Sequence, residues 1–156
     1  KIIKGNAYRG YQASMRRYFY GIKVQLLTTS TGIPVEFCLS VGSRADVKAL
    51  EELPFSLPVG SKIYADAAYT NYLIEDMLKE EAIYLIPERR SNSLRGDQPW
   101  VSYIKNTMRK IIETSISGIK ALFLRKIHAV TFRGFIIKII LFLLAFQFNK
   151  SSYLAT

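Results

Sequence analysis

The sequence is poor in several side chains that build common protein sites. It has one cysteine, one histidine and 12 acidic residues among 156. The lone Cys38 cannot form a disulfide within the chain, which fits a reduced, cytosolic compartment. His128 has no cysteine cluster or second histidine to complement it, so we expect no zinc site. The scarcity of carboxylates leaves few candidates for an acidic site.

The sequence also lacks a secretory leader and an apolar run long enough to cross a bilayer. Residues 1–6 have no extended apolar region and no initiator Met, so we expect the sequence to begin inside a longer reading frame. The most apolar run, 135–148, has 14 residues and is interrupted by Lys138, whereas a spanning helix needs about 20. We interpret this run as a buried helix and expect no membrane partner.

Positive charge, by contrast, is abundant. The chain has 22 Lys and Arg against 12 Asp and Glu, a formal net charge of +10. Such a surface attracts polyanions, nucleic acid first and anionic membrane second, although the charge could also serve solubility alone. The hydrophobic fraction of 49%, with 13% aromatic residues, argues against disorder, and the length suits about one domain with a core.

Periodicity predicts the elements of the first half. Residues 1–17 show no sustained period and predict an irregular basic lead-in, whose tyrosines either pack onto the core or stack on bases. Apolar residues alternate with a period of two on both sides of a turn at 30–32, which predicts a β-hairpin of strands 20–26 and 33–39. A short helix should follow from Ser43 to about Leu53.

The second half alternates strands with helices. We expect a strand at 61–65, a helix at 70–80 capped by Thr70, a central strand at 82–86, a long helix at 102–126 and a last apolar helix at 135–150. The inner stripe of the long helix has three- and four-residue spacing and comprises Ile104, Met108, Ile111, Ile112, Ile116, Ile119 and Phe123. Together the elements predict an α/β fold, with a mixed sheet flanked by helices.

Two carboxylates differ from the rest. Asp66 lies at the end of a predicted inner strand, where α/β sheets tend to place their sites. Glu113 shares one face of the long helix with Arg109 and Lys120. Carboxylates so placed can converge on Mg²⁺, and two such ions can cleave a phosphodiester. A turn role for Asp66 and a salt-bridge ladder on the helix remain open alternatives.

The other acidic side chains occur in neighbouring pairs on predicted helices. We expect them on solvated helix surfaces, because adjacent charges on a helix usually face water. These residues are Glu51, Glu52, Glu75, Asp76, Glu80 and Glu81.

A family resemblance supports the acidic site. The run Tyr64-Ala-Asp66-Ala-Ala-Tyr69, followed by Arg109-x-x-x-Glu113-x-x-x-x-x-x-Lys120, resembles the second and third acidic blocks of bacterial insertion-sequence DDE transposases. The third block often begins with a Tyr, where this chain has Asn106. The segment 18–24 is similar to the strand after the family's first Asp. The segment 126–135 and the apolar tail are similar to the ending of the insertion sequence nine-eighty-two group.

The resemblance implies a ribonuclease-H-like catalytic core that lacks its first strand. By this resemblance, residues 1–156 form a single catalytic domain. Its parts are the lead-in 1–17, a core at 18–126 and a C-terminal apolar helix within 127–156. The family's first Asp precedes the hairpin, and here no Asp precedes Asp46, which lies after both hairpin strands. By analogy that Asp would lie upstream of Lys1. We therefore expect an N-terminally truncated domain, with two of three catalytic carboxylates, that binds DNA weakly and is catalytically poor or inactive.

The resemblance also implies the function. Such an enzyme cleaves DNA at the transposon ends with water and then joins the freed 3′ hydroxyl to target DNA. Asp66 and Glu113 would ligate Mg²⁺ or Mn²⁺, Arg109 and Lys120 would stand beside them, and Tyr69 would line the Asp66 turn. Six cations are expected to contact the DNA backbone: Arg16, Arg17, Lys23, Arg89, Arg90 and Arg95.

The family further implies a bacterial, cytoplasmic, nucleoid-associated protein, with pairing of two subunits in the DNA complex. Three alternatives stay open: a DNA-binding remnant of the same fold without catalysis, a related metal-dependent nuclease, and a membrane-surface protein docked through its basic face and the helix 135–148.

Overall fold

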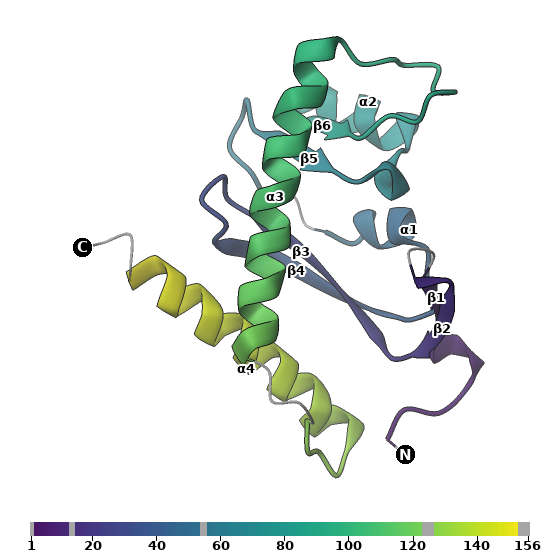
Figure 1. Ribbon diagram of the computed structural model, residues 1–156, viewed down its shortest axis with the longest axis vertical. Helices are drawn as coiled ribbons and strands as arrows, with labels where there is room; N and C mark the ends of the chain where they lie inside the picture. The colour runs from purple at the N-terminus through teal and green to yellow at the C-terminus, as the bar shows by residue number, and fades with distance from the viewer. Residues whose placement is uncertain (1, 13–14, 54–55, 123–126, 153–156) are drawn as a thin grey trace. The chain divides into compact units, whose positions relative to one another are not determined.

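The computed structural model describes residues 2–12, 15–53, 56–122 and 127–152 and has a mixed α/β architecture (Figure 1). The chain forms two compact units: unit 1 comprises residues 1–44 with 112–156, and unit 2 comprises residues 45–111. An α/β class is confirmed. The described strands pair in three two-stranded sheets and not in one mixed sheet, so the ribonuclease-H-like arrangement stays a prediction.

Unit 1 begins with a hairpin that the sequence did not predict. After the 3-10 turn η1 (Asn6–Tyr8), strands β1 (Arg9–Gln12) and β2 (Arg17–Tyr20) pair antiparallel. The prediction of an irregular lead-in over 1–17 is therefore wrong. Strands of four residues rich in Gly, Tyr and Arg are too short and too polar to give a detectable period of two.

The second hairpin of unit 1 confirms its prediction. Strands β3 (Ile22–Thr28) and β4 (Pro34–Val41) pair antiparallel, and Gly32 supplies a positive φ of 83° in the connecting turn. The Gly32 carbonyl accepts a 2.9 Å hydrogen bond from the buried hydroxyl of Ser115. This bond fastens the turn to the C-terminal half of helix α3 (Pro99–Leu122).

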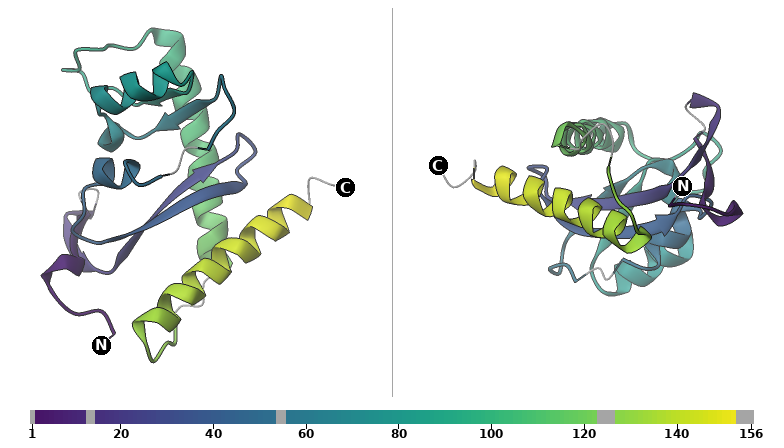
Figure 2. Two further views of the ribbon diagram at one scale, coloured as in Figure 1. Left: turned by 180° about the vertical axis from the view of Figure 1, so that it is seen from behind. Right: turned by 90° about the horizontal axis from the view of Figure 1, so that it is seen from below.

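The core of unit 1 lies between α3 and helix α4 (Phe132–Ser152), which crosses strand β4 (Figure 2). Ile119 packs with three residues of α4: Ile139, Leu143 and Phe146. Close approach of the two helices depends on Gly118, because a Cβ there would stand 2.6 Å from the Phe146 ring.

Helix α4 is less buried than predicted. The inner residues at 139, 143 and 146 are covered, whereas Ile137, Leu141, Leu144 and Phe148 are exposed on the opposite side of the helix. At 21 residues it is long and apolar enough to cross a membrane by length and composition, with 17% of its most apolar window buried, which is weak evidence of a span. A fully buried helix was therefore the wrong interpretation.

Unit 2 is built on a parallel pair of strands, β5 (Lys62–Ala65) and β6 (Tyr84–Pro87), connected through helix α2 (Tyr72–Glu80). Among the described strands β6 pairs with β5 alone and Tyr84 is exposed, so β6 is not the doubly buried central strand that we expected. The N-cap of α2 is Asn71 and not Thr70, since the Asn71 Oδ1 accepts hydrogen bonds from the N–H groups of residues 73 and 74.

Helix α2 ends in a Schellman motif. The N–H of Ile83 donates to the Leu78 carbonyl, and the N–H of Ala82 donates to the Lys79 carbonyl. Ala82 adopts a positive φ of 56°, a conformation that costs an L-residue free energy and that glycine adopts freely. The buried side chains of Leu78 and Ile83 supply the apolar contact typical of this motif.

The short helix α1 (Asp46–Leu50) completes unit 2 and contacts the 3-10 turn η3 (Ala67–Tyr69). Its N-cap is Ala45, so Ser43 does not begin the helix as expected. The Ser43 hydroxyl instead donates to the Ala7 carbonyl at 2.7 Å.

Candidate active site

Asp66 lies where the sequence predicts it, directly after strand β5. It precedes the turn η3, which is closed by a 3.0 Å hydrogen bond from the Tyr69 N–H to the Asp66 carbonyl. Tyr69 thus belongs to the turn that follows Asp66. The Asp66 side chain is 61% exposed, so its carboxylate is open to solvent and to ligands.

Glu88 is a second carboxylate at this edge, and the sequence analysis did not identify it. Strand register pairs Ala65 with Pro87, and the Glu88 N–H donates to the Ala65 carbonyl at 2.8 Å. Asp66 and Glu88 therefore follow the carboxyl ends of two neighbouring parallel strands. That shared position was the available signal, because the carboxyl ends of parallel strands meet at one edge of a sheet.

Arg109 of α3 bridges these two carboxylates. Its Nη1 lies 3.3 Å from Oε2 of Glu88 and 3.9 Å from Oδ1 of Asp66. The two carboxylate oxygens can be no farther apart than the sum of those distances. All three side chains are substantially exposed, so each pair contributes little to stability.

Glu113 and Lys120 lie farther along α3, on residues that belong to unit 1. Glu113 follows Arg109 by about one helical turn, and both Glu113 and Lys120 are exposed. Asp66 belongs to unit 2, so a site formed jointly by Asp66 and Glu113 stays a prediction.

The cations predicted to contact DNA fall into two groups. Arg16, Arg17 and Arg90 are exposed. Lys23 is partly buried and donates to the Arg44 carbonyl at 2.8 Å, whereas Arg89 and Arg95 pair with acidic residues of α2. A phosphate contact by Arg89 or Arg95 would compete with those pairs.

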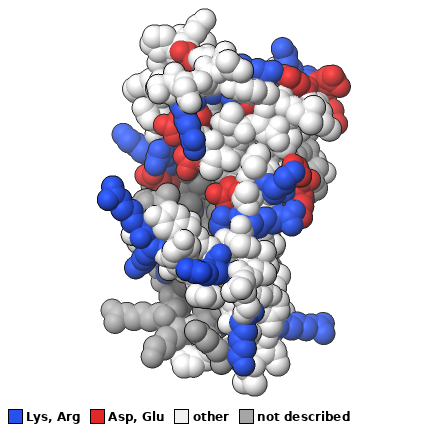
Figure 3. Space-filling model, turned by 90° about the vertical axis from the view of Figure 1, so that its right-hand side faces the viewer, with Lys and Arg blue, Asp and Glu red and all other residues white. Residues whose placement is uncertain are grey.

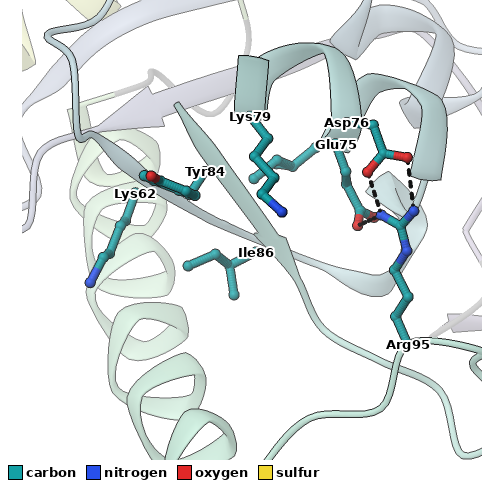
Figure 4. A pocket seen from close by; sticks show the side chains of 8 residues that line it. Lys62, Glu75, Asp76, Lys79, Tyr84, Ile86 and Arg95 are labelled. Carbon is teal, nitrogen blue, oxygen red and sulfur yellow. Dashed lines mark hydrogen bonds and ion pairs between the residues drawn. The ribbon is translucent and has the colours of Figure 1, made fainter. Parts of the chain in front are cut away.

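The pairs of Arg89 and Arg95 form an ionic cluster that is largely buried at Glu75 and Arg89 and exposed at Asp76 and Arg95. Glu75, expected on a solvated surface, is only 7% exposed and accepts a bidentate pair of hydrogen bonds from Arg89, at 2.8 and 2.6 Å. Arg95 reaches Glu75 at 3.3 Å and makes a bidentate pair with Asp76 at 2.9 and 2.8 Å (Figure 4). The surface prediction for Glu75 is wrong, since its helical position faces inward with Leu78, where arginines compensate its charge.

The ion pairs of the cluster shift the pKa values of three of its members. Hydrogen bonding from Arg95 holds the pKa of Asp76 below its ordinary value. The bonds to Glu75 raise the pKa of Arg89, and those to Asp76 raise the pKa of Arg95. An open hollow of about 530 Å³ adjoins the cluster, lined also by Lys62, Lys79 and Tyr84.

The donors at the strand ends suit a hard cation. Within the described part of the chain, no three Asp, Glu, His or Cys side chains gather closely enough to hold a metal ion by themselves. Mg²⁺ often takes only one or two carboxylates and completes its shell with substrate phosphates and water. The exposed carboxylates of Asp66 and Glu88 meet that requirement.

Comparison with known proteins decides the family. The family model described as the transposase DDE domain matches residues 3–148. The chain belongs to the DDE transposase family. No curated protein and no solved structure matches this transposase domain. Membership associates it with DNA transposition, with DNA binding and with the use of divalent metal ions at the level of the family.

Proposed function

We propose that this transposase domain cleaves phosphodiester bonds at insertion-sequence ends and transfers the freed strand to target DNA, in a metal-dependent reaction at Asp66 and Glu113. The observation that carries the proposal is the contact between Asp66 and Arg109. Arg109 belongs to the same Arg-x-x-x-Glu motif as Glu113, so the contact joins Asp66 to a residue of that motif. The family match over residues 3–148 supports the same conclusion.

The side chains have distinct roles in this proposal. Asp66 and Glu113 would hold Mg²⁺ or Mn²⁺, which when bound supplies Lewis-acid activation of the phosphodiester. Arg109 neutralises Asp66 and Glu88 before DNA enters and then pairs with a phosphate. Lys120 contributes positive charge for the DNA backbone, and Tyr69 maintains the turn that presents Asp66.

A non-catalytic DNA-binding remnant is the competing function. A related nuclease shares the metal chemistry and would differ in substrate.

Metal binding separates these functions without knowledge of the terminal DNA sequence. We would titrate Mn²⁺ into the protein with a duplex oligonucleotide and follow the bound ion by electron paramagnetic resonance. Asp66→Asn and Glu113→Gln should each weaken the same Mn²⁺ site by more than tenfold, because each removes a charged ligand. Glu80→Gln, an exposed carboxylate on α2, is the matched control and should leave binding unchanged.

If Asp66→Asn abolished Mn²⁺ binding and Glu113→Gln left it unchanged, the proposal that both residues hold one metal ion would be overturned. Binding of DNA by wild type without any Mn²⁺ site would establish the remnant.

A further inference from the structure

The first hairpin presents an aromatic face that the catalytic proposal does not use. In the β1–β2 register, Arg9 stands opposite Tyr20, and Tyr11 stands opposite Tyr18. Alternate residues of a strand share one face, so these four side chains lie together. Tyr11 is 52% exposed, Tyr18 is 61% exposed and Tyr20 is 54% exposed. We call this set of four residues the tyrosine face.

The opposite side of the hairpin is committed to packing within unit 1. A Cβ at Gly10 would stand 2.3 Å from the Gly42 carbonyl oxygen and 2.4 Å from the Phe19 ring, so this side lies close against the chain. A backbone hydrogen bond also holds the hairpin, since the Gly21 N–H donates to the Tyr8 carbonyl at 3.0 Å. The hairpin is thus held from behind, and the tyrosine face points outward.

Contacts within the tyrosine face order its rings. The centroids of Tyr11 and Tyr18 lie 5.1 Å apart at an interplanar angle of 58°, and the Arg9 guanidinium lies 4.0 Å from the Tyr18 centroid. The two cross-strand rows are about 7 Å apart, two residues along a strand. Ordered, exposed rings lose little conformational freedom when a flat partner stacks on them.

Charge selects the class of that partner. The first acidic residue in the sequence is Glu36, and six Lys or Arg residues precede it. Arg16 and Arg17 are exposed at the start of β2, where Arg17 stands opposite Gln12 on the other side of the hairpin from the tyrosine face. One end of the surface shown in Figure 3 likewise carries Lys and Arg without acidic side chains. Aromatic rings among cations, without carboxylates, are the combination that binds single-stranded nucleic acid.

We propose that the tyrosine face is a stacking platform for unpaired DNA bases, with Arg9 on the adjoining phosphates and Arg16 and Arg17 adding positive charge at the end of the hairpin. This rests on the proposed function, because strand cleavage and transfer leave single-stranded DNA ends. The bases of a duplex are already stacked on their neighbours, so the platform favours single strands over duplex.

Paired substitutions of the tyrosines test the platform. Fluorescence anisotropy with a labelled single-stranded oligonucleotide and with a duplex, at one fixed salt concentration, gives both affinities. The double variant Tyr11→Leu/Tyr18→Leu should lower single-strand affinity by about tenfold or more, because stacking on aromatic rings is lost. Its duplex affinity should change less than threefold. Tyr11→Phe/Tyr18→Phe keeps both rings and should keep single-strand affinity within threefold of wild type.

Tyr103→Leu is the matched control, because Tyr103 is 76% exposed on α3 and lies outside the hairpin. A Leu double variant that binds single strands like wild type, or no more weakly than Tyr103→Leu does, would overturn the platform. Equal losses for both forms of DNA would also overturn it, since stacking acts on unpaired bases.

The proposed function fails differently. A wild-type protein that binds neither single strands nor duplex would reject DNA as the substrate. A protein that binds duplex, and whose tyrosine substitutions have no effect, loses the platform alone.

Discussion

The two units are stabilised by different kinds of contact. The interior of unit 1 is a set of apolar side chains shared by α3 and α4, centred on Ile119 and Leu143. Unit 2 has a small parallel sheet beside which Glu75, Asp76, Arg89 and Arg95 form an ionic cluster. An apolar core tolerates changes of pH and salt, whereas a buried charge depends on each of its partners. Perturbations of the two units should therefore differ in kind.

Removal of the buried charge in unit 2 should have the largest effect. Glu75→Gln leaves Arg89 largely buried without its counter-ion, and we expect a loss of about 3–5 kcal/mol in the free energy of unfolding. Urea titration followed by the fluorescence of Trp100, the sole tryptophan and part of unit 2, measures this loss. Glu80→Gln on the same helix should cost less than about 0.5 kcal/mol. Equal costs for the two variants would refute the importance of the cluster.

Truncation of the apolar core should affect unit 1 by a comparable but smaller amount. Leu143→Ala creates a cavity beside Ile119, and we expect it to cost about 2–4 kcal/mol. Leu141→Ala changes the same residue type two positions earlier on α4, where the side chain is exposed, and should cost far less. Urea denaturation followed by circular dichroism distinguishes them. Similar losses would mean that the outer side of α4 is also covered in solution.

A stabilising substitution tests the end of α2. Ala82→Gly relieves the positive φ of the Schellman motif and should raise the stability of unit 2 by about 0.5–1 kcal/mol. Ala145→Gly, in the exposed interior of α4, should instead lower stability by about 1 kcal/mol. The two melting temperatures should shift in opposite directions, and a fall for both would argue against the strained turn.

Acid should weaken unit 2 through Asp76, with the smallest effect of the four. Because Arg95 holds the pKa of Asp76 below its ordinary 3.8, the folded chain binds this proton less tightly than the unfolded chain. The stabilisation is present above pH 3.8 and is lost as the pH falls through the folded-state pKa. Melting temperatures of wild type and Asp76→Asn should differ at pH 7 and converge near pH 2. A constant difference would show that Asp76 contributes through packing alone.

Sequence reasoning succeeded where a pattern is local. The strands β3 and β4, the existence of α3 and the position of Asp66 after β5 all depend on residues close in the sequence. The inner stripe of α3 was predicted only in part, because Ile119 is buried whereas Ile116 is 38% exposed and Phe123 lies outside the described residues. Sequence reasoning missed features that depend on a distant partner. Glu75 is buried because Arg89, 14 residues away, compensates it, and no helical period shows that pairing.

Two further elements were missed for reasons of length and symmetry. The hairpin of β1 and β2 consists of four-residue strands, too short for alternation to stand out. Helix α4 has apolar residues on opposite sides, so its composition predicts burial although only one side is covered. Glu88 was overlooked although it follows its strand much as Asp66 follows β5, and the register that pairs Ala65 with Pro87 makes the relation plain.

The proline at the end of β6 has a consequence for how the protein behaves at high concentration. The N–H groups of Tyr84 and Glu88 point toward β5, so those of residues 85 and 87 would point the other way. Pro87 has no N–H, and its carbonyl already accepts a 2.6 Å hydrogen bond from Lys105. Only residue 85 can then offer backbone groups to a strand from another molecule. The outer edge of β6 is thereby a poor template for strand addition by another molecule.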